Sequence, residues 1–229
     1  MSLILSIDTA TETASIALSD ESGVLEMMMN GQQKDHAAWI HHAIEQLMQK
    51  SGKRLNELNA VAVTAGPGSY TGLRVGMATA KGLCYVLKIP LITESTLKTM
   101  AQAAVEQLLK DSQITFDGLL CPMIDARRME VFTAVYDVKL NEVLSPRPLV
   151  LTGQSFEELL EKQPVLFFGS GSSKLKETVQ HINATCLDVR HDAGHLAQLA
   201  QAKFRVGDFT DAAYAEPVYL KEFYTHTKK

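Results

Sequence analysis

The residues most informative about the fold are Ala60-Val-Ala-Val-Thr-Ala-Gly-Pro-Gly-Ser-Tyr-Thr-Gly72. The continuous apolar run over residues 60–65 predicts a strand buried on both faces of a sheet. The glycine-rich turn that follows predicts a loop that opens a helix over residues 70–87. A strand, a glycine loop and a helix in this order are typical of open α/β sheets. The pattern returns at residues 165–168, which run into Gly169-Ser170-Gly171-Ser172.

Working outward from these two loops, the chain repeats one order of elements: three strands, a helix, a strand, a helix, a strand and a helix. In the first half we expect strands at residues 3–9, 14–18, 24–29, 60–65 and 90–93, and helices at 35–50, 70–87 and 96–110. In the second half we expect strands at residues 119–124, 130–136, 143–151, 165–168 and 186–189, and helices at 155–161, 175–181 and 196–206. Asp8 and Asp125 each end the first strand of a half.

This order predicts an α/β protein with two tandem ribonuclease H-like lobes in the actin-like ATPase architecture. We divide the lobes at residues 1–110 and 111–229, and leave open a return of the last 20 or so residues to the first lobe. Ligands of open α/β sheets lie beyond the carboxyl ends of the strands, so both halves should border one interlobe cleft. The cleft residues expected from this argument are Asp8, Thr9, Thr11, Gly68, Asp125, Gly169 and Gly171.

The same turns argue that nucleotide binding in this cleft is degenerate. Ala10 stands where a glycine would let the backbone approach a phosphate, and Glu12 adds negative charge. We therefore predict no cofactor held by the chain alone, and leave open a nucleotide at a partner interface.

Other catalytic chemistries have weaker support. A metal-dependent nuclease needs converging carboxylates, and only Asp8 and Glu45 are candidates. His191 and His195 have the i, i+4 spacing of metal ligands, but Asp192 between them predicts a helix cap that separates them, so no metal is expected. Neither Ser69 nor Ser172 lies in a Gly-x-Ser-x-Gly turn.

Bulk properties fit a cytoplasmic globular protein. The 229 residues are 46% hydrophobic, with a net charge of −4 and three widely separated cysteines. No run of Lys or Arg exceeds two residues, which argues against nucleic-acid binding by the chain alone. We expect neither a signal peptide nor a membrane span, since no stretch approaches about 20 apolar residues.

The helix over residues 70–87 carries a ridge of small side chains at Gly72, Gly76, Ala80 and Cys84. Glycine inside a helix costs about 1 kcal/mol relative to alanine, so the ridge indicates a close contact. That contact is either with the protein's own sheet or with another subunit. Our hypothesis is an association face that also includes Trp39, Ile40 and Leu47 of the preceding helix.

Several stretches together resemble the bacterial TsaB (YeaZ) family. They are Ile4-Leu-Ser-Ile-Asp-Thr-Ala-Thr11, Gly66-Pro-Gly-Ser-Tyr-Thr-Gly-Leu-Arg-Val-Gly76, Ala80-Lys-Gly-Leu83, Asp125-Ala-Arg127, Glu130-Val-Phe132 and Glu216-Pro-Val-Tyr-Leu220. The match spans nearly the whole chain. One departure is Lys221, where the family more often has arginine.

The resemblance implies an actin-like subunit that is not itself catalytic. Such a subunit dimerises, partners a TsaD-type catalytic subunit and a TsaE-type ATPase, and serves the threonylcarbamoylation of tRNA adenosine, meeting tRNA only through the complex. The family's contact surface is formed by helices that correspond to residues 35–50 and 70–87. The interface residues expected here are Trp39, Ile40, Leu47, Tyr70, Gly72, Leu73, Gly76, Ala80 and Leu83. An ATP-binding transferase or a glycoprotease-like hydrolase that acts alone remains the alternative.

Overall fold

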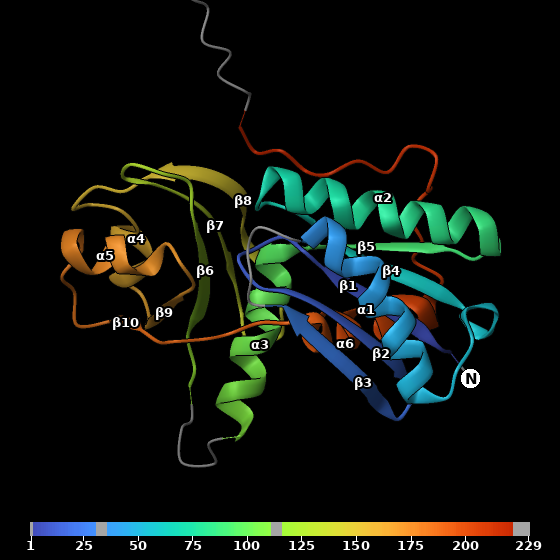
Figure 1. Ribbon diagram of the computed structural model, residues 1–229. Helices are drawn as coiled ribbons and strands as arrows, with labels where there is room; N and C mark the ends of the chain where they lie inside the picture. Colours follow the sequence, from blue (N-terminus) through green and yellow to red (C-terminus); the bar gives the residue numbers. More distant parts are fainter. Residues whose placement is uncertain (1, 31–35, 111–115, 222–229) are drawn as a thin grey trace, which may run out of the picture.

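The computed structural model describes residues 2–30, 36–110 and 116–221 (Figure 1). The first half contains β1 (Ile4–Asp8), β2 (Ala14–Asp20), β3 (Gly23–Asn30), α1 (His36–Ser51), a short 3-10 helix (Leu55–Glu57), β4 (Ala60–Gly66), α2 (Tyr70–Leu87), β5 (Leu91–Ser95) and α3 (Thr96–Lys110). The second contains β6 (Leu119–Asp125), β7 (Glu130–Tyr136), β8 (Glu142–Val150), α4 (Glu157–Leu160), β9 (Val165–Phe168), α5 (Ser172–Thr178), β10 (Ala184–Cys186) and α6 (Ala193–Val206). Asp35, expected to open the first helix, lies outside the described residues.

The two halves form two five-stranded sheets of the same topology. The strand orders are β3-β2-β1-β4-β5 and β8-β7-β6-β9-β10. In each sheet the first strand runs antiparallel to the second and parallel to the fourth. The repeat predicted from the order of elements is therefore confirmed, as is the pair of ribonuclease H-like lobes.

The helices do not stay within the lobe that their sequence position suggests. In Figure 1, α1 and α2 cover the outer face of the first sheet, α4 and α5 cover the outer face of the second, and α3 and α6 lie between the sheets. Leu196 and Ala200 of α6 pack on Ile4 and Ile92 of the first sheet. The apolar side chains of α3, by contrast, join the core of the second sheet. The division at residue 110 thus describes the strands but not these two helices.

The segment after α6 returns to the first lobe. Thr210 forms an antiparallel bridge with Leu91, Ala215 is buried in the core under α2, and the Val218 amide donates to the Ala65 carbonyl over 2.7 Å. In Figure 1 this segment runs beside α2. Residues 222–229 lie outside the described part of the chain.

Two elements of the second half are displaced from their expected positions. α5 begins and ends three residues before the helix expected at residues 175–181. β10 covers residues 184–186 rather than 186–189, because only this stretch pairs with β9. The apolar character of Val189 has another origin, since this residue packs into the core that α3 shares with the second sheet. Within the described ranges, none of the helices combines the length and the apolar character needed to cross a membrane.

Candidate functional site

A cleft of about 1040 Å³ lies where the carboxyl ends of both first strands meet. The turn after β1 and the loop before α2 form one wall, and the turn after β6 with Ser170 forms the other. The tail contributes residues 218–221, and His36 at the start of α1 completes the lining. The predicted interlobe cleft is therefore present, with the tail as an additional wall.

Asp8 lies behind the wall of the cleft and not in it. Its side chain is buried, and Oδ1 accepts hydrogen bonds from Thr64 Oγ1 at 2.9 Å and from the Ala10 amide at 3.1 Å. His191 Nε2 lies 3.4 Å from Oδ2. The first aspartate landmark thus fixes the turn after β1 and links it to the segment that leads into α6.

Asp125, the equivalent residue of the second lobe, is exposed in the cleft. Lys174 Nζ lies 2.6 Å from Oδ1, and this hydrogen bond holds the pKa of the Asp125 carboxyl below its usual value against the opposing effect of burial. The Arg127 amide donates to the same oxygen over 2.6 Å. The second carboxylate is therefore already neutralised within its own lobe.

The glycine loop before α2 packs against the turn after β1. A Cβ on Gly68 would lie 2.2 Å from the Ala10 carbonyl oxygen, so only glycine fits this approach. The Ser69 amide donates to that oxygen over 2.7 Å, and Thr9 Oγ1 donates to the Gly72 carbonyl over 2.7 Å. These groups hold the two segments together and are not presented to a ligand.

The second glycine loop is closed in the same way. The Gly171 amide donates to the Met123 carbonyl over 3.0 Å, and Ser170 Oγ accepts from the Asp125 amide over 3.0 Å. Gly169 has φ +93°, and a Cβ there would lie 2.4 Å from the Met123 carbonyl oxygen. Only Ser170 of this loop lines the cleft.

The structure thus divides the expected cleft residues into two groups. Thr11, Gly68 and Asp125 line the cleft. Asp8, Thr9, Gly169 and Gly171 lie behind its walls and hold them in place, as the contacts above show.

Sequence reasoning allowed that the arginines of the turn after β6 could meet an anion, but it did not place the aromatic groups or Arg74 at the mouth of this cleft. The rings of Tyr70 and Tyr219 lie 5.3 Å apart, and the Arg74 guanidinium lies 4.6 Å from the centre of the Tyr70 ring. Arg127 lines the opposite wall and Arg128 follows it. The motif over residues 216–220 was a usable signal. Tyr70, which lies 149 positions before Tyr219 in the chain, could not be identified from it as a neighbour.

The expected association face is largely wrong as a set of contact residues. Ile40, Leu47, Leu73 and Ala80 are buried in the core of the first lobe, so their side chains cannot meet a partner. Gly72 and Gly76 face β1 of the same chain, since a Cβ on either would clash with Thr9. Trp39 and Leu83 are half-buried, and of the expected residues only Tyr70 is exposed. The small-residue ridge is therefore an internal packing surface.

The opposite sides of the same helices are open. Ala38, His41 and Glu45 of α1 are exposed, as are Ala78 and Gly82 of α2. Tyr85 and Val86 near the end of α2 are 86% and 74% exposed. These seven residues, hereafter the outer α1–α2 face, are among the residues of the two helices that another chain can reach.

The two histidines near α6 have separate structural roles. His191 lies beside Asp8, whereas His195 belongs to a capping box with Asp192, the predicted cap of α6. Among the residues that the structure describes, no three His, Cys, Asp or Glu side chains form a group that could hold a metal ion.

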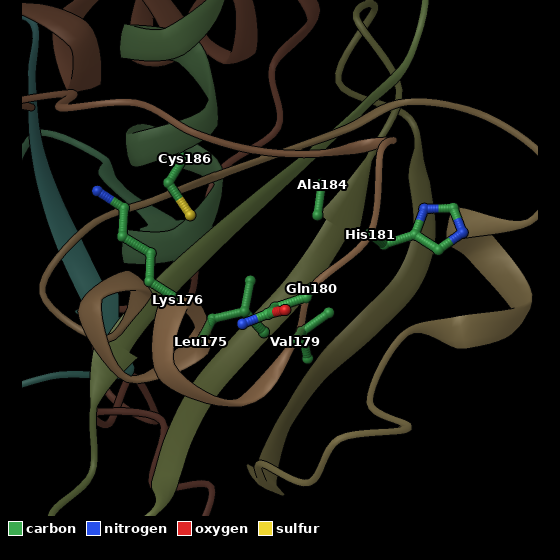
Figure 2. A pocket seen from close by; sticks show the side chains of 7 residues that line it. All are labelled: Leu175, Lys176, Val179, Gln180, His181, Ala184 and Cys186. Atoms are coloured by element: carbon green, nitrogen blue, oxygen red, sulfur yellow. The ribbon is translucent and has the colours of Figure 1, made fainter.

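A second pocket, of about 390 Å³, lies between α5 and β10. Figure 2 shows Cys186 and Lys176 on one side of it and His181 on the other. Burial raises the pKa of the Cys186 thiol, with Lys176 acting in the opposite direction, so this thiol is not activated as a nucleophile.

Comparison with known proteins gives a consistent result. The sequence model of the family described as TsaD, tRNA N6-adenosine threonylcarbamoyltransferase, matches residues 24–221. The tRNA threonylcarbamoyladenosine biosynthesis protein TsaB of Bacillus subtilis strain 168 is 35% identical over 80% of this chain and 77% of its own length. The TsaB protein of Haemophilus influenzae is 29% identical over 98% of this chain and 96% of its own length. The structure of YeaZ from Pseudomonas aeruginosa superposes with a TM-score of 0.79 at 25% identity, covering 96% of this chain and all of that one. The chain belongs to the TsaB (YeaZ) family.

Proposed function

We propose that the chain is a non-catalytic subunit of the tRNA threonylcarbamoyladenosine-forming complex, and that it pairs with and activates a TsaD-type catalytic subunit. A TsaE-type ATPase is the third protein of the assembly, and tRNA is reached through the complex. The observation that carries the proposal is the internal use of the groups that chemistry in the cleft would need. Asp8 is buried beside Thr64 and His191, and Asp125 is paired with Lys174. The Ser69 and Gly171 amides of the two glycine loops donate within the chain.

The outer α1–α2 face is the surface proposed for the partner. Its exposed side chains are mostly small or apolar, and the aromatic ring and branched side chain at Tyr85 and Val86 would anchor an interface. The small residues Ala78 and Gly82 allow the backbone of another helix to approach closely. When no partner is present, the same face is expected to form a homodimer.

The test is co-purification with a TsaD-type subunit from the same cell, followed by a tRNA threonylcarbamoylation assay. We expect a stable pair, modification that requires both proteins, and no modification by this chain alone. Val86→Asp should weaken the pair at least tenfold, because a carboxylate would be desolvated in the interface.

Val206→Asp on α6 is the matched control, since Val206 is also a helix valine and is 79% exposed. It should leave association unchanged, and both variants should keep the thermal stability of the parent. An equal loss of association in the two variants would show that the outer α1–α2 face is not the partner surface. Modification or ATP turnover by the pure chain would overturn the non-catalytic role.

A further inference from the structure

We propose that the mouth of the interlobe cleft binds a single-stranded segment of RNA, with a base stacked beside Tyr219 and Tyr70 and backbone phosphates at Arg127 and Arg128. The proposal rests on the proposed function, which places the chain in an RNA-modifying complex. It assigns a direct RNA contact to this subunit. From the sequence, by contrast, we expected the subunit to meet tRNA only through the complex.

The first observation is the aromatic pair. Tyr70 comes from the start of α2 and Tyr219 from the tail, and they are 37% and 44% exposed although they lie 5.3 Å apart. Arg74 lies over the Tyr70 ring at 4.6 Å, which adds positive charge to the platform. Exposed aromatic rings next to arginine are the surfaces on which unpaired bases stack.

The second observation is the turn between β6 and β7 on the other wall. Arg127 and Arg128 have φ values of +70° and +48°, a left-handed conformation that costs a non-glycine residue of order 1 kcal/mol. The turn is held by the Asp125–Arg127 contact and by a hydrogen bond of 3.1 Å from the Glu130 amide to the Arg127 carbonyl. In the described part of the chain neither guanidinium forms an ion pair. Two strained arginines in one turn, of which Arg127 lines the cleft, suit a polyanion.

The charges around the cleft limit where phosphates can lie. Asp125 is paired with Lys174, and Lys221 is paired with Glu130. Glu12 lines the cleft beside the turn after β1. Phosphates are therefore attracted to the Arg127–Arg128 side and repelled from the Glu12 side, so the base is directed toward Tyr219.

The closed backbone favours an RNA strand over a free nucleoside triphosphate. A triphosphate is usually held by the free amides of glycine turns. Here the amides of Ala10, Ser69 and Gly171 all donate to groups of the same chain. With these three amides engaged, side chains at the rim such as Arg127 are the anion-binding groups that suit phosphates spaced along a strand.

The test measures binding of a fluorescein-labelled single-stranded oligoribonucleotide to the full chain at low ionic strength. Tyr219→Leu should weaken binding about tenfold through loss of base stacking. The double variant Arg127→Gln with Arg128→Gln should weaken it to a similar extent, and should lower the slope of log affinity against log salt by about 1.4 for two lost phosphate contacts.

Two control variants match these changes. Tyr214→Leu removes an 83% exposed ring from the same tail, and Arg147→Gln with Arg190→Gln removes two exposed arginines outside the cleft lining. Both should bind as the parent does. Absence of binding by the parent, equal loss in the controls, or displacement of the RNA by an equal concentration of ATP would overturn the RNA site.

The same variants in the complex separate this inference from the proposed function. If the complex forms and modifies tRNA equally well with the Tyr219 and Arg127–Arg128 variants, the RNA site is wrong and the proposed function stands. If the chain binds RNA as expected but pairs with no TsaD-type subunit, the function is wrong and the site stands.

Discussion

Gly76 and Gly82 lie on the same helix but have opposite surroundings. A Cβ on Gly76 would lie 2.3 Å from Thr9 Oγ1 and 3.4 Å from Val63 Cγ2, whereas a Cβ on Gly82 would meet nothing within 4 Å. Gly76 is therefore glycine because α2 approaches the end of β1 closely. No internal contact explains Gly82, which belongs to the outer α1–α2 face.

These surroundings predict opposite effects of the same substitution. Gly76→Ala should lower the free energy of unfolding by about 1–3 kcal/mol through overpacking. Gly82→Ala should raise it by about 0.5–1 kcal/mol, because alanine favours helix and restricts the unfolded chain. Urea denaturation of the two variants gives the comparison, and a Gly76→Ala protein as stable as the parent would contradict the packing argument.

At the scale of elements, α3 and α6 are joined by a cluster of charged groups at the start of α6. His195 Nδ1 lies 3.1 Å from the Asp192 amide and 3.0 Å from Asp192 Oδ1, and its Nε2 lies 3.5 Å from Glu106 of α3. Burial alone lowers the pKa of His195, but Asp192 and Glu106 outweigh it, so the pKa is raised. Protonation of this histidine therefore strengthens the link between the two inner helices.

The raised pKa determines the sign of a pH effect. The contribution of His195 to stability should be complete below its unfolded pKa of about 6.5 and should be lost as pH rises through the higher folded pKa. The difference in unfolding free energy between the parent and His195→Gln should thus shrink from mildly acidic to alkaline pH. His41→Gln on the exposed side of α1 is the control, and a difference independent of pH would refute the assignment.

At the scale of the whole molecule, the lobes depend on each other through exchanged elements. The inner face of the first sheet is covered by α6 from the far end of the chain, and its outer core includes Ala215 of the tail. Lys221 then reaches Glu130 of the second lobe. The molecule should therefore unfold as a single unit even though its two sheets are similar.

A fragment of residues 1–110 tests this dependence. It would expose Ile4, Ile92 and the small side chains between them, which α6 buries in the full chain. We expect no cooperative thermal transition by circular dichroism from this fragment alone, and recovery of a transition when residues 111–229 are co-expressed with it. A sharp transition near that of the full chain would show that the first lobe folds independently.

The sequence alone determined the order of elements, both aspartate landmarks, the cap at Asp192 and the existence of an interlobe cleft. These depend on periodicity and on turn residues, which act between neighbours in the chain.

The sequence could not determine which side of α2 is buried, because a ridge of small residues fits a sheet and a partner equally well. The sequence also predicted β10 at the wrong residues. An apolar run such as the one around Val189 has the same pattern whether it pairs with a strand or packs under a helix. The exchange of α3 and α6, the return of the tail and the meeting of Tyr219 with Tyr70 follow from contacts between residues far apart in the chain, which only the tertiary structure decides.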